Sequence, residues 1–382
     1  MKLKTYRYVP KDGHKNNFDT SLDSPSTVIF VFGAPDCRND KTIFEDLKQK
    51  FPRSLLIGCS GAGEIFNNHV YDHSLSVAIA QFSHTKVKMA TMHIGEMSQS
   101  FDAGKKLAEK LNTPELSGVF VLSDGLKING SDLVRGLSEN LSPKVIVTGG
   151  LAGDGSDFKE TWTLNNGLPV SGHISAVGFY GNKIKLGHSS QGGWDIFGPE
   201  RIVTKSEANV LYELDGKPAL SLYKEYLGDE AKGLPAAALL FPLQIRLNEN
   251  DNKRIVRTIL AVDELKQTMT FAGNIPQGSL AQLMRANFER LIEGASTAAE
   301  LLDKGGEKEP RLAIAISCVG RRLVLGERID EEVEATLERL PAGTQQVGFY
   351  SYGEISPFVK GQSCELHNQT MTLTTISEEE AA

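Results

Sequence analysis

The chain has 382 residues, of which 40% are hydrophobic and 23% are charged, and this is the composition of an ordinary globular protein. A chain of this length exceeds most single hydrophobic cores, so we expect two domains. The formal net charge is -7, and the sequence contains no block of Lys or Arg residues. Both facts argue against nucleic acid or an anionic membrane as the partner. No run of about 18 apolar residues occurs, so we expect a cytoplasmic protein.

The first regular elements along the chain form a strand, a helix and a second strand. The apolar run STVIFVFG is followed by a helical pattern over 40–51 and by the run SLLIGCS. The same order returns in SGVFVLSDG, a helix over about 130–140 and KVIVTGG, and again in RLAIAISCVG, a helix over 331–340 and QQVGFYSYG. The sequence therefore predicts an α/β (α+β) protein whose two domains are built from duplicated strand-helix-strand-hairpin units with mixed sheets.

Each second strand runs into a glycine-rich turn, and a hairpin pattern follows it. The turns are GCSGAGEI (58–65), GGLAGDG (149–155) and GFYSYGEI (348–355). The stretches after them alternate with period two: SLSVAIAQF with KVKMATMHI, HISAVGFYGNKIKLGHS, and CELHNQTMTLTTI. We therefore expect a pair of antiparallel strands after each unit.

A fourth region, from 211 to about 277, has a different pattern. It predicts a helix at PALSLYKEYLG, a strand at AAALLFPLQI and strands at RIVRTILAV and QTMTFAGNI, before a long amphipathic helix that ends at Leu302. This region is either a degenerate fourth copy or an insertion. GEKEP, at 306–310, has the composition of a loop. We place an N-terminal arm at 1–25, a first domain at 26–208 and a second at 209–382.

The glycine turns are the first candidates for a binding site. Glycines at the ends of parallel strands let backbone N–H groups face a ligand, and several such turns could converge on one pocket. The alternative is that strand-to-hairpin geometry alone requires them. No phosphate-binding signature occurs among them. The candidate ligand-binding residues are Ser60, Gly61, Gly63, Glu64, Gly149, Gly150, Asp154, Trp194, Tyr352, Gly353, Glu354 and Asn368.

Glu64 and Glu354 occupy equivalent places in the two GEI tripeptides. Two such carboxylates could face a cationic group such as the ammonium of an amino acid. Alternatively, each accepts backbone hydrogen bonds within its own turn. Asp124 and Asp154, in the second unit, have the same two interpretations.

Signatures of catalysis are missing from the sequence. There is no GxSxG elbow, no HExxH and no CxxC, so we expect a binding protein rather than an enzyme. The four cysteines, Cys37, Cys59, Cys318 and Cys364, are too far apart in a pattern without CxxC to predict a disulfide framework or a zinc site, and we interpret Cys59 and Cys318, at the ends of apolar runs, as buried free thiols without a catalytic role. A hydrolase or lyase that uses Cys59 or Asp154 is the enzymatic alternative.

Several motifs resemble a known family. The run GHSSQGGWDIFGPERIVTKSEANVLYELDGKPALSLY, followed by FAGNIPQG, FYSYGEISP and ELHNQTMTLTTI, resembles the paired FIST N and FIST C domains of bacterial signalling proteins. The resemblance covers nearly the whole chain and assigns 26–208 to FIST N and 209–382 to FIST C. It implies a sensory module for small ligands, with amino acids as the proposed ligands. It does not imply catalysis.

A narrower resemblance concerns a cofactor. Single FIST chains of this length are similar to nitric-oxide-sensing haem proteins that regulate histidine kinases in two-component systems. That similarity implies haem b with a histidine as axial ligand, for which His188 is the first candidate and His173 and His367 are the alternatives. Without haem, the resemblance implies an amino acid or small-metabolite sensor. In both cases we expect a separate signalling partner such as a histidine kinase, and the chain could form a homo-oligomer.

Overall fold

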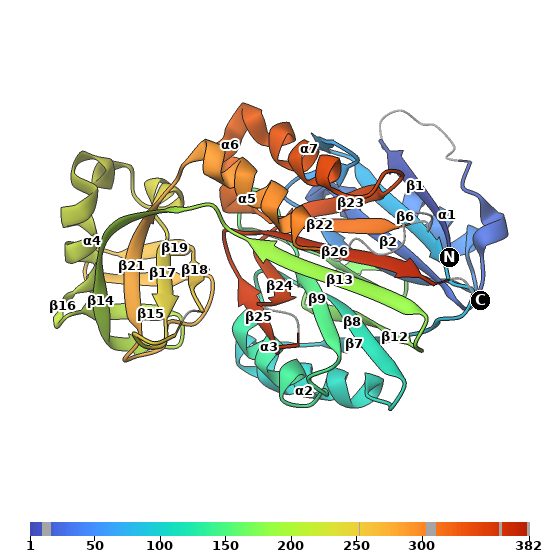
Figure 1. Ribbon diagram of the computed structural model, residues 1–382, viewed down its shortest axis with the longest axis horizontal. Coiled ribbons are helices and arrows are strands. Elements are labelled where there is room, and N and C mark those ends of the chain that lie inside the picture. Colours follow the sequence, from blue (N-terminus) through green and yellow to red (C-terminus); the bar gives the residue numbers. More distant parts are fainter. Residues whose placement is uncertain (10–16, 252, 303–310, 359–360, 380–382) are drawn as a thin grey trace.

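The computed structural model describes residues 1–9, 17–251, 253–302, 311–358 and 361–379. A large α/β body contains three six-stranded sheets, and a smaller β domain lies at one end of it (Figure 1). The predicted mixed α/β class is confirmed. Within the described part of the chain, no helix is long and apolar enough to cross a membrane.

The three sheets of the body repeat one arrangement. Their strand orders are β1-β6-β2-β3-β10-β11, β7-β12-β8-β9-β24-β25 and β13-β26-β22-β23-β4-β5. Each contains a central parallel pair, an antiparallel strand beside it and an outer strand. The strands of the first sheet are Lys2–Tyr8 (β1), Thr27–Gly33 (β2), Leu55–Ser60 (β3), Leu75–Gln81 (β6), Thr163–Asn165 (β10) and Leu168–Val170 (β11).

The second and third sheets have the following bounds. The second contains Lys86–His93 (β7), Leu116–Ser123 (β8), Ile146–Leu151 (β9), His173–Tyr180 (β12), Gly353–Pro357 (β24) and Cys364–His367 (β25). The third contains Glu64–Phe66 (β4), His69–Tyr71 (β5), Ile184–Gln191 (β13), Leu312–Cys318 (β22), Gln345–Ser351 (β23) and Met371–Glu378 (β26). The strand-helix-strand unit predicted three times is therefore confirmed.

Each unit gives a hairpin to a neighbouring sheet. β4–β5 follows β3 but pairs with β23, β10–β11 follows β9 but pairs with β3, and β24–β25 follows β23 but pairs with β9. The exchange closes into a cycle around the body, so each sheet is completed by a segment from another unit.

The strands predicted after each unit are present, but the prediction that they pair with each other is wrong. β7 pairs with β12 and not with β6, β13 pairs with β26 and not with β12, and β25 pairs with β24 and not with β26. In the first two copies the second of the expected strands, β7 or β13, becomes an outer strand of a different sheet, whereas in the third copy β26 lies between β22 and β13. Period-two alternation predicts a strand and its apolar face. It does not predict the neighbouring strand, because any strand of the sheet buries its apolar side chains on the same face.

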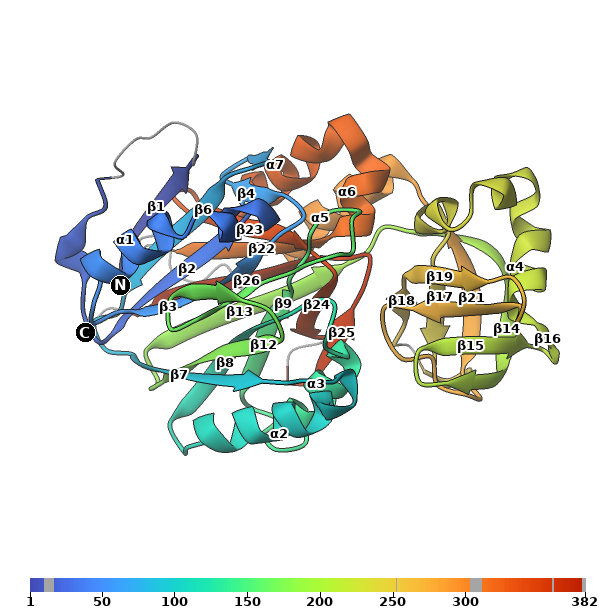
Figure 2. The same ribbon diagram turned by 180° about the vertical axis from the view of Figure 1, so that it is seen from behind.

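Helices cover the sheets and bury their apolar runs. They span Thr42–Lys50 (α1), Ser100–Leu111 (α2), Gly130–Ser138 (α3), Phe288–Glu300 (α5), Val319–Leu325 (α6) and Ile329–Arg339 (α7). Figure 2 shows α2 and α3 on one side of the body and α5 to α7 on another. β2 and β22 are buried at every position, which explains their continuous apolar sequences.

Three glycines hold the same place in the three sheets. A Cβ atom at Gly58, Gly149 or Gly348 would lie 2.3, 1.7 or 1.8 Å from a carbonyl oxygen of the neighbouring parallel strand. No side chain fits at such a distance, so the packing of the strand pair requires glycine at each of these positions.

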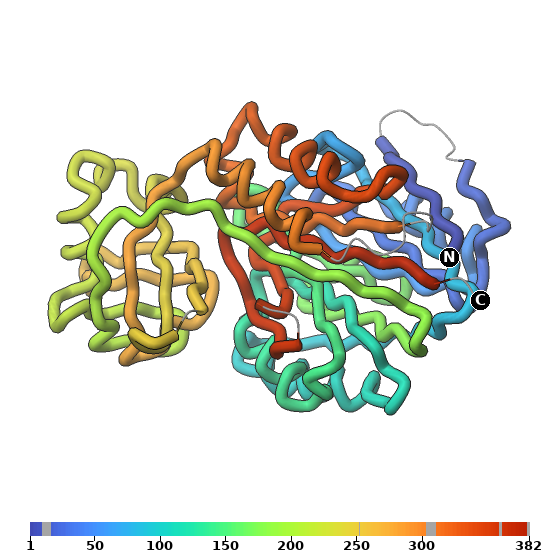
Figure 3. Tube along the Cα trace, viewed as in Figure 1, coloured from blue at the N-terminus to red at the C-terminus, as the bar shows by residue number. Residues whose placement is uncertain are grey.

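The region between β13 and α5 is an insertion with its own core. Its elements are Asp195–Glu207 (β14), Val210–Leu214 (β15), Lys217–Pro218 (β16), Ala219–Leu227 (α4), Leu243–Arg246 (β17), Ile255–Arg257 (β18), Ile259–Asp263 (β19), Thr268–Phe271 (β20) and Leu280–Arg285 (β21). Its buried residues form a hydrophobic cluster separate from those of the body. Figure 3 shows the chain crossing between the body and the insertion twice, before β14 and after β21.

Two strand predictions in the insertion need correction. Only 243–245 of AAALLFPLQI lie in a strand (β17), because 236–240 form a 3-10 helix, and RIVRTILAV is divided into β18 and β19, which pair with different strands. The boundary predicted after residue 208 lies between β14 and β15, which pair with each other. The predicted loop 306–310 lies outside the described residues.

Candidate ligand-binding site

The three glycine turns meet inside the body. A closed ring of three backbone hydrogen bonds joins them: Ala62 N to Tyr350 O (2.8 Å), Tyr352 N to Leu151 O (3.2 Å) and Gly153 N to Ser60 O (3.0 Å). The sequence suggested that N–H groups of these turns face a ligand. The N–H groups of Ala62, Gly153 and Tyr352 donate to carbonyl oxygens of the neighbouring turns instead.

A cavity of about 470 Å³ lies beside this ring, and we call it the glycine-turn cavity. Its walls come from 34–39, 61–64, 72–73, 154–160 and Arg322. Four of the predicted ligand-binding residues, Gly61, Gly63, Glu64 and Asp154, line it together. Its carboxylates are Asp36, Glu64, Asp72, Asp154, Asp157 and Glu160, and its bases are Arg38, Lys159 and Arg322. The lining is therefore acidic.

Most of these charges already have partners in the structure. The ion pairs are Arg322–Asp72 (2.8 Å), Lys159–Asp157 (3.5 Å) and Arg38–Glu160, and Nδ1 of His73 lies 2.9 Å from Oδ2 of Asp36. Asp154 accepts backbone hydrogen bonds from Phe158, Lys159 and Glu160, and the hydroxyl of Tyr352 also donates to it. Asp154 thus holds its own loop in place.

Glu64 differs from the other carboxylates of the cavity. It is only 1% exposed, and its Oε2 accepts hydrogen bonds from the backbone and the hydroxyl of Ser74, each at 3.1 Å. Its Oε1 has no hydrogen-bond partner among the described residues. Burial raises the pKa of Glu64 well above its ordinary value, although the Ser74 hydrogen bonds oppose this. A buried carboxyl oxygen is therefore available to a donor in the cavity.

Glu354, the second GEI glutamate, lies outside this cavity. Its Oε1 accepts from Ser351 Oγ at 2.7 Å, and its Oε2 accepts from the backbone and hydroxyl of Thr370 at 3.2 and 2.9 Å. Burial raises the pKa of Glu354 to about 8. The structure therefore does not bring Glu64 and Glu354 to one ligand. The residue in register with them in the second unit is Thr163, whose hydroxyl donates to His173 O at 3.1 Å.

A second cavity, of about 680 Å³, lies between β13 and the insertion, and we call it the histidine cavity. His188, His367 and Trp194 all line it. Nε2 of His367 lies 3.0 Å from the carbonyl oxygen of Ser356 and donates to it, and burial lowers the pKa of His367 to about 4. Nε1 of Trp194 donates to the carbonyl of Gln369 at 2.9 Å. The imidazole of His367 is therefore neutral near pH 7.

His173 is in a different place, at the start of β12. It lies 3.2 Å from Asn165 Nδ2 and packs edge-on against His93. The structure thus brings two of the three candidate axial histidines together and separates the third.

The other predicted site residues are part of the packing around the ring. Ser60 Oγ accepts from Trp162 N at 3.1 Å, and Gly353 pairs with Leu151 across β24 and β9. Tyr352 stacks on Phe158 with 4.7 Å between ring centroids. Nδ2 of Asn368 donates to Tyr352 O at 3.5 Å, and its Oδ1 is buried without a partner among the described residues. Gly149 and Gly150 lie in β9, against neighbouring strands.

The four cysteine thiols are buried, and Asp124 accepts hydrogen bonds from the backbone around it. All four cysteines are buried and free, and burial raises the pKa of Cys59 far above its ordinary value and that of Cys318 to about 12. Asp124 accepts backbone hydrogen bonds from Leu126, Lys127 and Gly172.

Sequence reasoning missed Arg322. It follows the fully buried Arg321, which pairs with Glu332 inside the body, and its own guanidinium donates to Ala62 O and to Asp72 at the cavity. The available signal was the Arg321–Arg322 pair three residues after the apolar strand LAIAISC. Arginine is almost never fully buried unless it is paired, so two arginines this close to a buried strand indicate charged partners near the strand end.

These features define the class of protein: a mixed α/β protein with a solvent-accessible cavity beside its strand-end turns. The model of the FIST N domain matches residues 27–217 and that of the FIST C domain matches 219–357. The chain belongs to the FIST family, whose domains are sensory domains of signal transduction.

A protein from an archaeon is similar over most of the chain. The uncharacterized protein MJ1623 of Methanocaldococcus jannaschii is 26% identical over 367 residues, which are 89% of this chain and 68% of that protein. Among solved structures, cyanuric acid hydrolase from A. caulinodans aligns over 99% of both chains with a TM-score of 0.38 and 9% identity.

Proposed function

We propose that this chain is a cytoplasmic sensor that binds a small amine or amino acid in the glycine-turn cavity. Membership of the FIST family supports the sensory role. The observation that carries the choice of ligand is Oε1 of Glu64, a buried carboxyl oxygen on the cavity wall without a partner among the described residues.

The chemistry of the walls matches a ligand with an ammonium group. An ammonium has three donors and no acceptor, so it satisfies an unpaired carboxylate oxygen in an acidic cavity. Arg38 and Lys159, whose side chains are 26% and 77% exposed, could receive the carboxylate of an amino acid at the mouth. Because the pKa of Glu64 is raised, binding of a cation releases its proton, and affinity should increase as pH rises.

The position of the cavity suggests how a signal would leave it. Its walls come from the first unit, from the loop after β9 in the second unit and from Arg322 in the third. A ligand that contacts all of them favours one arrangement of the three units over others. We expect a separate protein, such as a histidine kinase, to recognise that arrangement.

Calorimetric titration with a panel of amino acids and primary amines tests this function. Glu64→Gln should reduce the affinity of the best ligand by about tenfold to a hundredfold, since a charge-assisted hydrogen bond is lost. Glu354→Gln is the matched control, because it changes the equivalent glutamate outside the cavity, and it should leave affinity within about twofold. Equal losses in the two variants, or no binding by any member of the panel, would contradict the proposal.

Haem in the histidine cavity is the second candidate, and one observation favours it. His188 and His367 share a cavity whose walls include Leu186, Val256 and Phe358, so the residues fit a group that needs an imidazole and apolar surroundings. Arg254, which is exposed and also lines the cavity, could pair with a propionate. Haem bound there would supply an iron whose second face takes a diatomic gas such as nitric oxide.

Absorbance spectra after haem reconstitution test this candidate. A Soret band at about 400 nm should appear in the wild type and be lost or shifted in His188→Ala or His367→Ala. His173→Ala is the matched control, because His173 lies outside the cavity, and it should keep the band. Colourless protein after reconstitution would remove haem from consideration and leave the amine proposal untouched.

A further inference from the structure

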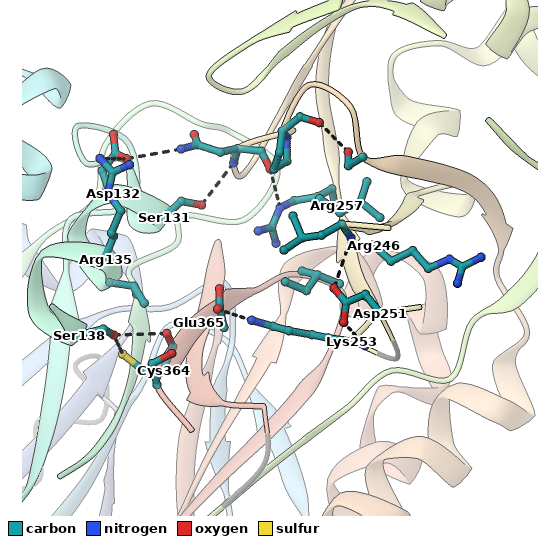
Figure 4. Close-up of a pocket in the computed structure, with 18 of the residues that line it drawn as sticks. Ser131, Asp132, Arg135, Ser138, Arg246, Asp251, Lys253, Arg257, Cys364 and Glu365 are labelled. Atoms are coloured by element: carbon teal, nitrogen blue, oxygen red, sulfur yellow. Dashed lines mark hydrogen bonds and ion pairs between the residues drawn. The ribbon is translucent and has the colours of Figure 1, made fainter. Parts of the chain in front are cut away.

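A third cavity, of about 550 Å³, lies between the body and the insertion, and we call it the Arg257 cavity. Figure 4 shows α3 and the strand that carries Cys364 and Glu365 on one side, and residues of the insertion on the other. The walls come from 131–139 and 363–365 in the body and from 245–251, 253–257 and 274–279 in the insertion. Neither the amine proposal nor the haem proposal uses this cavity.

Arg257 is the buried charge of this cavity. It is 4% exposed, and burial lowers its pKa to about 10. Its Nε donates to Asn274 O at 3.2 Å, and its Nη1 donates to Leu366 O at 2.9 Å and Val256 O at 3.4 Å. Among the described residues it pairs with no carboxylate, and its Nη2 makes no hydrogen bond. Glu365 and Glu354 act on this charge only from a distance, and a buried guanidinium without a hydrogen-bonded carboxylate is costly, which points to a missing partner.

The other bases on the walls are already neutralised. Lys253 pairs with Glu365, Arg135 pairs with Asp132 at 3.1 Å, and Arg246 pairs with Glu200. In Figure 4 the guanidinium of Arg257 extends toward α3, whereas that of Arg246 points away from the cavity. An anion that enters would therefore find its counter-charge at Arg257.

The remaining wall residues indicate how many negative charges such an anion carries and that the rest of the molecule is apolar. Four carboxylates, of Asp132, Glu139, Asp251 and Glu365, stand against the four bases and oppose a ligand with several negative charges. Apolar side chains complete the lining: Val134, Ile245, Leu247 and Ile255. We infer that this cavity binds a small organic monocarboxylate, with its carboxylate on Arg257 and its apolar body against the insertion strands.

Bound there, the ligand would fasten the insertion to the body. The two already meet through the FAGNIPQG segment: Asn274 N donates to Ser131 Oγ at 3.3 Å, and Asn129 Nδ2 donates to Asn274 Oδ1 at 3.1 Å. Gly273 makes room for the guanidinium, since a Cβ there would lie 2.8 Å from Arg257 Nε. The FAGNIPQG segment thus forms the side of the cavity where the insertion already contacts the body, and a ligand bound to Arg257 would add a further contact to α3.

Titration with benzoate as the probe tests the site. Benzoate should bind the full chain, whereas benzamide, which has the same shape and no charge, should bind at least about tenfold more weakly. Arg257→Gln should lower benzoate affinity by at least about tenfold, and the matched control Arg246→Gln should stay within about twofold. Glu64→Gln should also leave benzoate binding unchanged, which separates this site from the glycine-turn cavity.

A second variant covers the event that Arg257→Gln does not fold. Ser138→Phe places a ring in the cavity from α3, away from Arg257, and should abolish benzoate binding in a protein whose near-ultraviolet circular dichroism is native. Benzoate that fails to bind the wild type, or that binds Ser138→Phe and folded Arg257→Gln as well as the wild type, would overturn the inference. Binding of inorganic phosphate in place of benzoate would overturn it as well.

Discussion

The two GEI turns place the same glutamate in two different surroundings. Glu64 and Glu354 both accept the backbone N–H and hydroxyl of the residue after their hairpin, Ser74 or Thr370. Only Glu354 has a donor for its other oxygen, because Ser351 stands where the first turn has Gly61. One residue in the turn therefore separates a satisfied structural carboxylate from one that is open to a ligand.

This difference explains why the same tripeptide gives one cavity residue and one packing residue. The shared half of the interaction closes the hairpin in both units. Whether the second carboxyl oxygen has a hydrogen-bond donor depends on the neighbouring residue, and Gly61 has no side chain that could donate. Replacing these groups should therefore change the stability of the two turns by different amounts.

Removal of the whole carboxylate should have the largest effect, and it should be larger at Glu354. Glu354→Ala leaves the donors of Ser351 and Thr370 buried without an acceptor, so we expect a loss of about 3–4 kcal/mol in the free energy of unfolding. Glu64→Ala leaves only Ser74 without its acceptor, beside a cavity that admits water, so we expect about 1–2 kcal/mol. Urea unfolding of both variants measures this, and equal losses would show that the surroundings do not matter.

The pH dependence of stability, counted per pH unit, should come next. The pKa of Glu354 is raised from 4.5 to about 8, so its contribution is complete below about pH 4.5 and is lost as pH rises through 8. Glu354→Gln keeps the neutral shape, so its stability relative to the wild type should increase by up to about 1.4 kcal/mol per pH unit over that window. Denaturation at several pH values checks this, and a constant difference between the two proteins would refute it.

The smallest effect should come from Ser351→Ala. It removes the donor to Oε1 of Glu354 and so gives the third unit the arrangement of the first. We expect a loss of about 1 kcal/mol, the net value of one hydrogen bond, together with a still higher pKa for Glu354. Ser356→Ala is a suitable control, since its buried hydroxyl donates only to the carbonyl of Pro357. Unchanged stability in Ser351→Ala would mean that the hydroxyl contributes nothing.

Local sequence patterns predicted the elements of the fold well. The apolar runs at 27–33, 116–123 and 312–318 are buried first strands of three parallel pairs, and the glycine turns follow the second strands. The partners of the remaining strands could not be read from alternation, since β7 and β13 present the same period to any sheet they join. The hairpin exchange was missed for the same reason.

The candidate sites were predicted in part. The GEI repeat indicated Glu64 and the glycine turns, because the chemistry lies in adjacent residues. Arg322 and Arg257 come from segments far along the chain, and only the topology brings them to a cavity wall. Short motifs identify groups that act together within one turn, whereas a cavity between units depends on contacts that no local pattern contains.

The exchange of hairpins has a consequence for how the body comes apart. Detaching any one unit would strip an edge from a neighbouring sheet and would also lose the edge that another unit supplies to its own. Slow amide exchange should therefore disappear from the three sheets together, in one cooperative opening. The insertion, which is joined at two crossings and keeps a core of its own, could open on a different timescale without disturbing them.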